Sequence, residues 1–281
     1  MESAASRTAM MAALARGLFR LETPPPWVLD DVFALVLVGP VWQELREQLY
    51  PLFPGPVRDE TAAAVCTRSR YAEDRLAAGA FTQYVILGAG LDSFAWRRPD
   101  LLGSLTVFEV DHPASQGWKL ERVRDLGLPL GGSQVFVPVD FEAESLRDAL
   151  DAAGFDWGRP AMFSWTGVAP YLTAPAIEST LRTIAGAAAG SEVVFSYLAE
   201  DSVLDETGRE YLRIYTPVAA SLGEPVRPGW PVTGIEHLIG RCGLTVVDHP
   251  ARADLQQRYF AGRADGLRPY TGETLVAARV P

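Results

Sequence analysis

Apolar and polar residues alternate in two different rhythms along this chain, and the rhythm changes near residue 80. Before that point, apolar residues recur at helical spacing. Ser6 can cap a helix over Ala9–Leu21, which stops before three consecutive prolines. Two further helices are predicted over 41–53 and 59–79. The sequence therefore predicts a helical region over residues 1–80.

After residue 80, short apolar runs alternate with helical segments. The runs that predict strands are Tyr84–Leu87, Leu105–Val110, Gln134–Val139, Ala161–Trp165, Glu192–Tyr197, Leu244–Val247 and Thr274–Val280. The helical segments between them cover 117–127, 143–154, 174–190 and 234–243. This alternation predicts an α/β fold with a seven-stranded, mostly parallel, Rossmann-like sheet that has helices on both faces and right-handed crossovers.

One segment, residues 200–233, breaks the alternation between the fifth and sixth strands. A long insertion in a compact α/β domain is typical of a lid or a substrate wall. A surface helix followed by a proline-rich return would give the same sequence pattern. We expect a single domain over 1–281. It comprises a helical cap (1–80), a core (81–199), this insertion, and the C-terminal end of the core (234–281).

The stretch QYVILGAGLDS, residues 83–93, has the pattern of a strand followed by a glycine turn. Gly88 and Gly90 would let the backbone approach a ligand closely, at the strand end where open parallel sheets bind ligands. A tight turn that needs positive φ would use the same glycines. The third glycine of the dinucleotide fingerprint is absent, since Phe94-Ala95-Trp96 follows.

Acidic residues follow the next two strands. Asp111 comes about twenty residues after Gly90, where a carboxylate can accept both ribose hydroxyls. Asp140 could accept from an adenine amino group, and Phe141 could flank the ring. Asp140 could also be the N-cap of a helix over 143–153, and Asp111 a helix-capping acid. The glycine turn and Asp111 together favour an adenosine ligand.

The chain carries no phosphate-binding motif and no arginine placed for a 2′-phosphate. Asp92 in the glycine turn would repel a pyrophosphate but can pair with an ammonium group. These features indicate S-adenosylmethionine as the cofactor. Its adenosine would meet Asp111 and Asp140, and its positively charged methionine end would lie at the glycine turn.

The motifs SRTA, RSRYAED, VILGAGLDS, FEVDHP, PVDF and WTGVAPYLT occur in this order from Ser6 onward. In this order they resemble the leucine carboxyl methyltransferase family, over nearly the whole chain. The nearest resemblance is to its bacterial branch of S-adenosylmethionine-dependent O-methyltransferases, which includes enzymes that methylate polyketide carboxyl groups. The resemblance implies a class I methyltransferase fold.

The resemblance also implies roles for individual residues. An arginine ahead of the first strand, here Arg70 or Arg68, would grip the cofactor's carboxylate, and Arg7 would close over the same group. Gly88, Asp111 and Asp140 match the family's cofactor contacts. Many relatives carry Glu-Gly in the fourth-strand motif where this chain has Thr166-Gly167. Thr166 lacks that negative charge, although it is still expected to line the pocket.

We expect methyl transfer by in-line displacement. A carboxylate acceptor is already ionised at pH 7 and needs no general base, whereas a hydroxyl acceptor would benefit from one. The three histidines are His112, His237 and His249, and His112 lies nearest the expected cofactor. None of them is a clear base.

Five residues could form the substrate wall. Two follow or end strands and three lie in the insertion, namely Tyr171, Tyr197, Tyr211, Arg213 and Tyr215. They would suit a flat apolar acceptor, and Arg213 could pair with an acidic one, but the same side chains could simply pack the core or the lid.

The composition of the chain argues against several classes of ligand and site. The net charge of -10 argues against nucleic-acid binding, and no apolar run is long enough to span a membrane. The two cysteines show no metal or disulfide spacing, so we expect a cytoplasmic protein with free thiols and without a metal site. The family resemblance implies a small-molecule acceptor. The sequence leaves open whether it is a monomer or a homodimer. It also leaves open a non-methylating cyclase, a methyltransferase of protein C-terminal carboxylates and a binding protein on the same fold.

Overall fold

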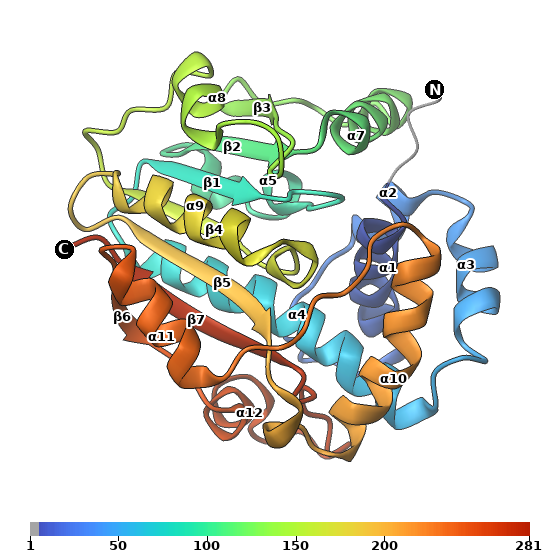
Figure 1. The fold of residues 1–281 in the computed structure, drawn as a ribbon. Coiled ribbons are helices and arrows are strands. Elements are labelled where there is room, and N and C mark those ends of the chain that lie inside the picture. Colours follow the sequence, from blue (N-terminus) through green and yellow to red (C-terminus); the bar gives the residue numbers. More distant parts are fainter. Residues whose placement is uncertain (1–5) are drawn as a thin grey trace.

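The computed structural model describes residues 6–281 and has a seven-stranded sheet at its centre (Figure 1). The strands, given in their spatial order, are β3 (Gln134–Pro138), β2 (Thr106–Asp111), β1 (Gln83–Leu87), β4 (Ala161–Trp165), β5 (Glu192–Leu198), β7 (Glu273–Arg279) and β6 (Thr245–Asp248). Neighbouring strands pair in parallel, except that β7 runs antiparallel to both β5 and β6. The predicted seven-stranded, mostly parallel sheet is confirmed.

Helices cover both faces of the sheet. Their bounds are α1 (Arg7–Glu22), α2 (Ala34–Val38), α3 (Trp42–Leu49), α4 (Gly55–Ala78), α5 (Phe94–Arg97), α6 (Pro99–Leu102), α7 (Pro113–Asp125), α8 (Leu146–Ala152), α9 (Ala174–Ala185), α10 (Glu206–Ser221), α11 (Val232–Arg241) and α12 (Arg252–Phe260). Two short 3-10 turns, η1 (Ala169–Tyr171) and η2 (Asp201–Val203), complete the elements.

The strands are apolar on both sides because each face is covered. In β1, Val85 and Leu87 pack into one core with α8, α9 and α11, whereas Tyr84 and Ile86 pack into the other core with α4, α5 and α12. Alternate residues of a strand point to opposite faces, so a strand buried on both sides reads as a continuous apolar run. This explains why the strands were visible in the sequence.

The cap is helical, as the sequence predicts. Ser6 is the N-cap of α1, and its Oγ accepts a hydrogen bond from the backbone N–H of Ala9 at 3.1 Å. Gly79 is the C-cap residue of α4. The five-residue helix α2 is not predicted, because its apolar run is too short to show helical periodicity.

The insertion between β5 and β6 forms α10 and then returns irregularly to α11. Figure 1 shows α10 beside α1 and α4, next to the carboxyl ends of the parallel strands. The return is tied to the core, since the Arg227 N–H donates to the Pro170 carbonyl at 2.8 Å and Trp230 forms a β-bridge with Ala199.

The prediction that Asp140 caps a helix over 143–153 is wrong. The helix there, α8, begins at Leu146, and Ser145 is its N-cap, with Oγ accepting from the Asp148 N–H at 3.2 Å. Asp140 instead heads a turn, in which its carbonyl accepts from the Glu144 N–H at 2.8 Å. The residues between them are in turns, and this leaves the Asp140 side chain free of the helix.

Candidate active site

A cavity of about 1140 Å³ opens at the carboxyl ends of β1, β2 and β4. The strand order reverses here, since β1 pairs with β2 on one side and with β4 on the other. Open α/β sheets bind ligands at such a switch point. Pockets for single drug-sized ligands hold about 300–1,000 Å³, so this cavity has room for a cofactor together with a small acceptor.

The glycine turn after β1 forms the floor of this cavity. Gly88 and Gly90 both line it and have φ of 68° and 47°, which favour glycine. A Cβ on Gly88 would overlap Cγ2 of Val168, and a Cβ on Gly90 would lie 2.9 Å from Cβ of Ala9 in α1. The glycines therefore serve both the left-handed backbone and the close approach of neighbouring segments.

Asp111 ends β2 and lines the cavity beside the glycine turn. One carboxylate oxygen accepts from the Gly90 N–H, and the other accepts from the His112 N–H at 2.6 Å. Burial raises the pKa of Asp111, and these two N–H donors oppose that rise. An ionised carboxylate has about four lone-pair positions, so two further donors can still bind it.

Three more predicted cofactor residues line the same cavity. Asp140 and Phe141 follow β3, and Thr166 follows β4. The Asp140 carboxylate accepts from the Glu142 N–H at 3.0 Å. Asp92 also lines the cavity, and its carboxylate accepts from the Phe94 N–H at 2.7 Å. The sheet thus brings the ends of three strands together at one opening.

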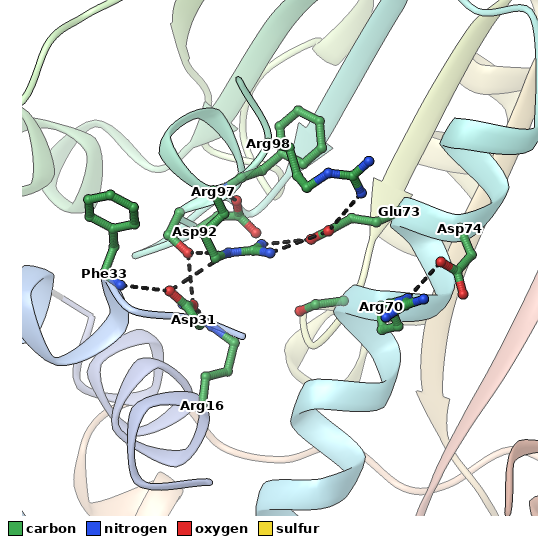
Figure 2. A network of polar contacts seen from close by, with 12 residues as sticks. Arg16, Asp31, Phe33, Arg70, Glu73, Asp74, Asp92, Arg97 and Arg98 are labelled. Atoms are coloured by element: carbon green, nitrogen blue, oxygen red, sulfur yellow. Dashed lines mark hydrogen bonds and ion pairs between the residues drawn. The ribbon is translucent and has the colours of Figure 1, made fainter. Parts of the chain in front are cut away.

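Of the two candidate arginines on α4, Arg68 lines the cavity and Arg70 does not. Residues two positions apart on an α-helix point about 200° apart, so the two side chains leave opposite sides of α4. Arg70 pairs at the surface with Asp74 at 2.7 Å, as Figure 2 shows. The Arg68 Nη1 donates to both carboxylate oxygens of Glu273 at 2.9 Å, and its Nη2 lies against Gly167.

Arg7 lines the cavity at the first turn of α1. Next to it, Thr8 donates its hydroxyl to the carboxylate of Glu224, which lies in the irregular return after α10, and both residues line the cavity. Sequence reasoning did not identify Glu224, because an irregular segment gives no periodic signal for the direction of its side chains.

Aromatic rings line the far end of the cavity. Tyr171 lies in η1, Tyr211 and Tyr215 lie on α10, and Phe53 lies in the cap. The Tyr171 and Tyr215 hydroxyls are 2.6 Å apart, and the rings of Tyr211 and Tyr215 stack with centroids 5.0 Å apart. Burial raises the pKa of Tyr171, Tyr211 and Tyr215, so all three stay protonated at neutral pH.

Two residues predicted for the substrate wall lie outside the cavity. Tyr197 is buried in the sheet, where its hydroxyl is 2.9 Å from Nε2 of His249. Arg213 is exposed and pairs with Glu210 at 2.7 Å. Arg213 is two residues from both Tyr211 and Tyr215 on α10, so it points away from the face that those tyrosines share.

A buried polar network lies behind the glycine turn (Figure 2). Asp31, from the segment between α1 and α2, pairs with Arg16 of α1 at 2.8 Å and accepts from the Ser93 hydroxyl at 2.8 Å. Arg97 of α5 pairs with Glu73 of α4 at 2.6 Å. Burial alone would raise the pKa of Asp31, but the charges of Arg16 and Arg97 hold it below its usual value.

One of the three histidines lines the cavity, and the residues that the structure describes contain neither a metal-binding cluster nor a membrane-spanning helix. Of the three histidines, His112 lines the cavity as the N-cap of α7, whereas His237 and His249 do not line it. Among residues 6–281, no group of three or more His, Cys, Asp or Glu side chains is arranged to hold a metal ion. Over the same residues, no helix has both the length and the apolar character needed to cross a membrane.

Comparisons with known proteins identify relatives of this chain. YktD of Bacillus subtilis (strain 168) is 36% identical over 189 residues, which are 67% of this chain and 62% of that protein. A relative from Mycolicibacterium gilvum (strain PYR-GCK) is 30% identical over 311 aligned positions, covering 98% of this chain and 95% of the relative. Both carry the name "putative S-adenosyl-L-methionine-dependent methyltransferase".

The fold has close counterparts among solved structures. A DUF574 family protein from Streptomyces avermitilis MA-4680 superposes with a TM-score of 0.61 and 17% identity, covering 95% of this chain and 97% of that one. The model of the leucine carboxyl methyltransferase family matches residues 9–185, which include the glycine turn and the ends of β2, β3 and β4. The chain therefore belongs to the leucine carboxyl methyltransferase family.

Proposed function

We propose that this protein is an S-adenosylmethionine-dependent O-methyltransferase that acts on a small-molecule carboxylate of natural-product type. The observation that carries the proposal is the position of Asp111, which is held beside the positive-φ turn of Gly88 and Gly90 at the switch point of the sheet. The names of the relatives support the choice of cofactor.

The residues present fit the adenosine half of this cofactor. The Asp111 carboxylate keeps lone pairs for two ribose hydroxyls after binding the Gly90 and His112 N–H groups. Asp140 can accept from the adenine amino group, and Phe141 can pack against the ring. The cavity has no need of a phosphate cradle for this ligand.

The methionine half requires groups of both signs. Arg68 has N–H groups on Nε and Nη2 that Glu273 does not bind, so it can hold a carboxylate, and Arg7 lies at the same cavity. Asp92 can pair with the ammonium group. Thr166 would present a hydroxyl where the family resemblance implies a carboxylate, so a sulfonium bound there would meet a dipole instead of a full charge.

Bound S-adenosylmethionine would supply a methyl group on a positively charged sulfur, which is a good leaving group. The chain would contribute proximity and alignment. Tyr171, Tyr211 and Tyr215 stay protonated and cannot act as bases. A carboxylate is already ionised at neutral pH, so it needs no base, and this favours a carboxylate over a hydroxyl acceptor.

Two measurements test the proposal. Calorimetry with S-adenosylmethionine and S-adenosylhomocysteine should show binding, and its absence for both ligands would reject the proposal. Transfer of a radioactive methyl group is then measured with aromatic and aliphatic carboxylic acids and with the matching alcohols. A methyl ester releases its label as methanol in mild alkali, whereas a methyl ether keeps it, so the product identifies the acceptor oxygen.

A further inference from the structure

The cap contacts the glycine turn from two directions. From the cavity side, α1 covers the turn, because Cβ of Ala9 would lie only 2.9 Å from a Cβ on Gly90. In a second contact, side chains of the cap enter a buried polar network that includes the turn itself (Figure 2). The second contact is the more specific one, since it consists of charged groups with fixed partners.

Arg16 of α1 joins the cap to the turn with two separate donors. Its Nε donates to the Asp31 carboxylate at 2.8 Å, and its Nη2 donates to the Leu91 carbonyl at 2.7 Å. Leu91 directly follows Gly90. The planar guanidinium therefore fixes the distance between a cap carboxylate and the backbone of the turn.

Asp31 makes a second connection. Its Oδ2 accepts from the Ser93 hydroxyl at 2.8 Å, and Ser93 lies at the end of the same turn. The Ser93 Oγ also accepts from Nε of Arg97 at 2.8 Å. The Nη2 of Arg97 in turn donates to the carboxylate of Glu73 in α4 at 2.6 Å. One carboxylate thus links the cap, the turn and, through Arg97, the long helix α4.

These groups cannot separate at low cost. The side chain of Asp31 is 0% exposed, that of Arg16 is 8% exposed and that of Arg97 is 5% exposed. A buried charge that loses its partner is strongly destabilising, because water cannot replace the lost contact. The turn and the cap should therefore keep their relative positions as one unit.

We propose that Asp31 is a positioning residue for cofactor binding, which sets the conformation of the glycine turn through Ser93 and Arg16. Asp31 and Ser93 do not line the cavity, so they would act on the cofactor through neighbours that do line it, namely Arg16 and the residues of the turn. The inference rests on the proposed function, because it takes the turn to be the cofactor site.

Coupling of this kind is reciprocal. If docking of the cap strengthens cofactor binding, the cofactor must stabilise the docked cap by the same factor. S-adenosylhomocysteine should therefore slow hydrogen exchange in α1 and in the segment around Asp31, as well as in the turn itself. A residue that merely contributes to global stability would not give this linked pattern.

The test uses the substitution Asp31→Asn, because asparagine keeps the shape of the side chain and removes its charge. Binding of S-adenosylhomocysteine is measured by calorimetry, well below the unfolding temperature of each variant. We expect an affinity about tenfold lower than that of the unchanged protein. The ligand-induced protection of α1 against hydrogen exchange should fall with it.

The chain offers a matched control at Glu192, the first residue of β5, at the edge of the sheet opposite to the cavity. Glu192 is also buried and also accepts from two arginines, Arg75 of α4 at 2.7 Å and Arg279, but it does not line the cavity and has no hydrogen bond to α1 or to the glycine turn. Glu192→Gln should lower the unfolding temperature and leave the affinity for S-adenosylhomocysteine unchanged. An equal loss of affinity in both variants would overturn the proposal, since affinity would then follow stability alone.

A second variant keeps the proposal testable if Asp31→Asn does not fold. Ser93→Ala removes one hydrogen bond to Asp31 without leaving any charge unpaired, so folding should survive. We expect a smaller but measurable loss of affinity. Binding by Ser93→Ala and by any folded Asp31→Asn at the affinity of the unchanged protein would overturn the proposal. Failure of the unchanged protein to bind would instead reject the proposed function, and it is therefore measured first.

Discussion

The two halves of the cavity are built in different ways. The half beside β1, β2 and β3, which we assign to the cofactor, is made of short loops that leave neighbouring strands and carry Gly88, Asp111 and Asp140. The other half, which we assign to the acceptor, is made of side chains from the cap, η1 and the insertion, among them Phe53 and Tyr215.

This difference has a functional consequence. Loops at the ends of hydrogen-bonded strands are held in position by the sheet, so one ligand can be bound in a fixed geometry. Helices from separate segments are held to each other mainly by side-chain contacts, so the shape of their half changes with a few substitutions. We therefore expect substitutions in each half to affect one ligand and leave the other unchanged.

The largest effect is expected in the cofactor half, at the glycine turn. Gly88→Ala forces φ near 68° on a residue with a Cβ and crowds that Cβ against Val168. Strain and overpacking each cost about 1–3 kcal/mol, so the free energy of unfolding should fall by about 2–6 kcal/mol. Urea unfolding measures this. Gly103→Ala, with no atom within 4 Å of the new Cβ, should have no such effect.

The next effect concerns the cofactor directly. Asp111→Ala should weaken binding of S-adenosylhomocysteine by about 1–3 kcal/mol, the cost of leaving ribose hydroxyls without their acceptor. Calorimetry gives the affinity. The acceptor KM should not change when it is measured at a cofactor concentration that saturates the variant. An affinity equal to that of the unchanged protein would show that Asp111 does not bind the ribose.

In the acceptor half we expect the reverse pattern. Tyr171→Phe and Tyr215→Phe each remove one of the paired hydroxyls. Each substitution should raise the acceptor KM by an amount that corresponds to about 0.5–1.5 kcal/mol of binding free energy. The affinity for S-adenosylhomocysteine should stay the same. Tyr197→Phe is the matched control, because it also loses a buried hydroxyl contact but lies outside the cavity. A shift in cofactor affinity would contradict the division into halves.

A smaller effect depends on pH. Because burial raises the pKa of Asp111, this carboxyl takes up its proton at a higher pH than an ordinary aspartate. Bonds from ribose hydroxyls favour the ionised form, so cofactor affinity should be constant above that pKa and fall as the pH drops through it. The ligand-free protein should gain stability over the same range. Calorimetry at several pH values checks the first point, and Asp111→Asn should remove the dependence.

The smallest effect marks the outer limit of the acceptor half. The Arg213 side chain is 70% exposed and its ion pair with Glu210 lies at the surface, where such pairs contribute about 0–1 kcal/mol. Arg213→Ala should therefore change neither the acceptor KM nor the cofactor affinity. Steady-state kinetics with an acidic acceptor would reveal any role in pairing with it.

Much of the fold follows from the sequence, because the strands are short apolar runs, and the predicted runs that end at Leu87, Val110 and Val139 are followed directly by a glycine or an aspartate. Gly88, Asp111 and Asp140 could be placed at one edge for this reason, since carboxyl ends of parallel strands meet at the same edge of a sheet. All three line the cavity, and their contacts with a cofactor remain a prediction.

The direction of side chains on helices was harder to predict. Sequence reasoning put Arg70 ahead of Arg68 as the cofactor arginine, and it grouped Arg213 with Tyr211 and Tyr215. Each choice depends on which face of α4 or α10 meets the cavity, and that is fixed by packing against the cap and the sheet. Because α4 carries buried residues on several faces, it has no clear apolar stripe from which the direction of Arg68 could be read.

The sequence by itself determined the order of elements, the parallel sheet and the polar residues at its carboxyl edge, because these depend on local periodicity and on the fixed geometry of strands. Only the tertiary structure decided what surrounds that edge. It brought Arg16, Asp31 and Ser93 together from three segments, and it placed Tyr171 of η1 against Tyr215 of α10. Contacts between distant segments depend on how helices pack, and no local pattern in the sequence records that packing.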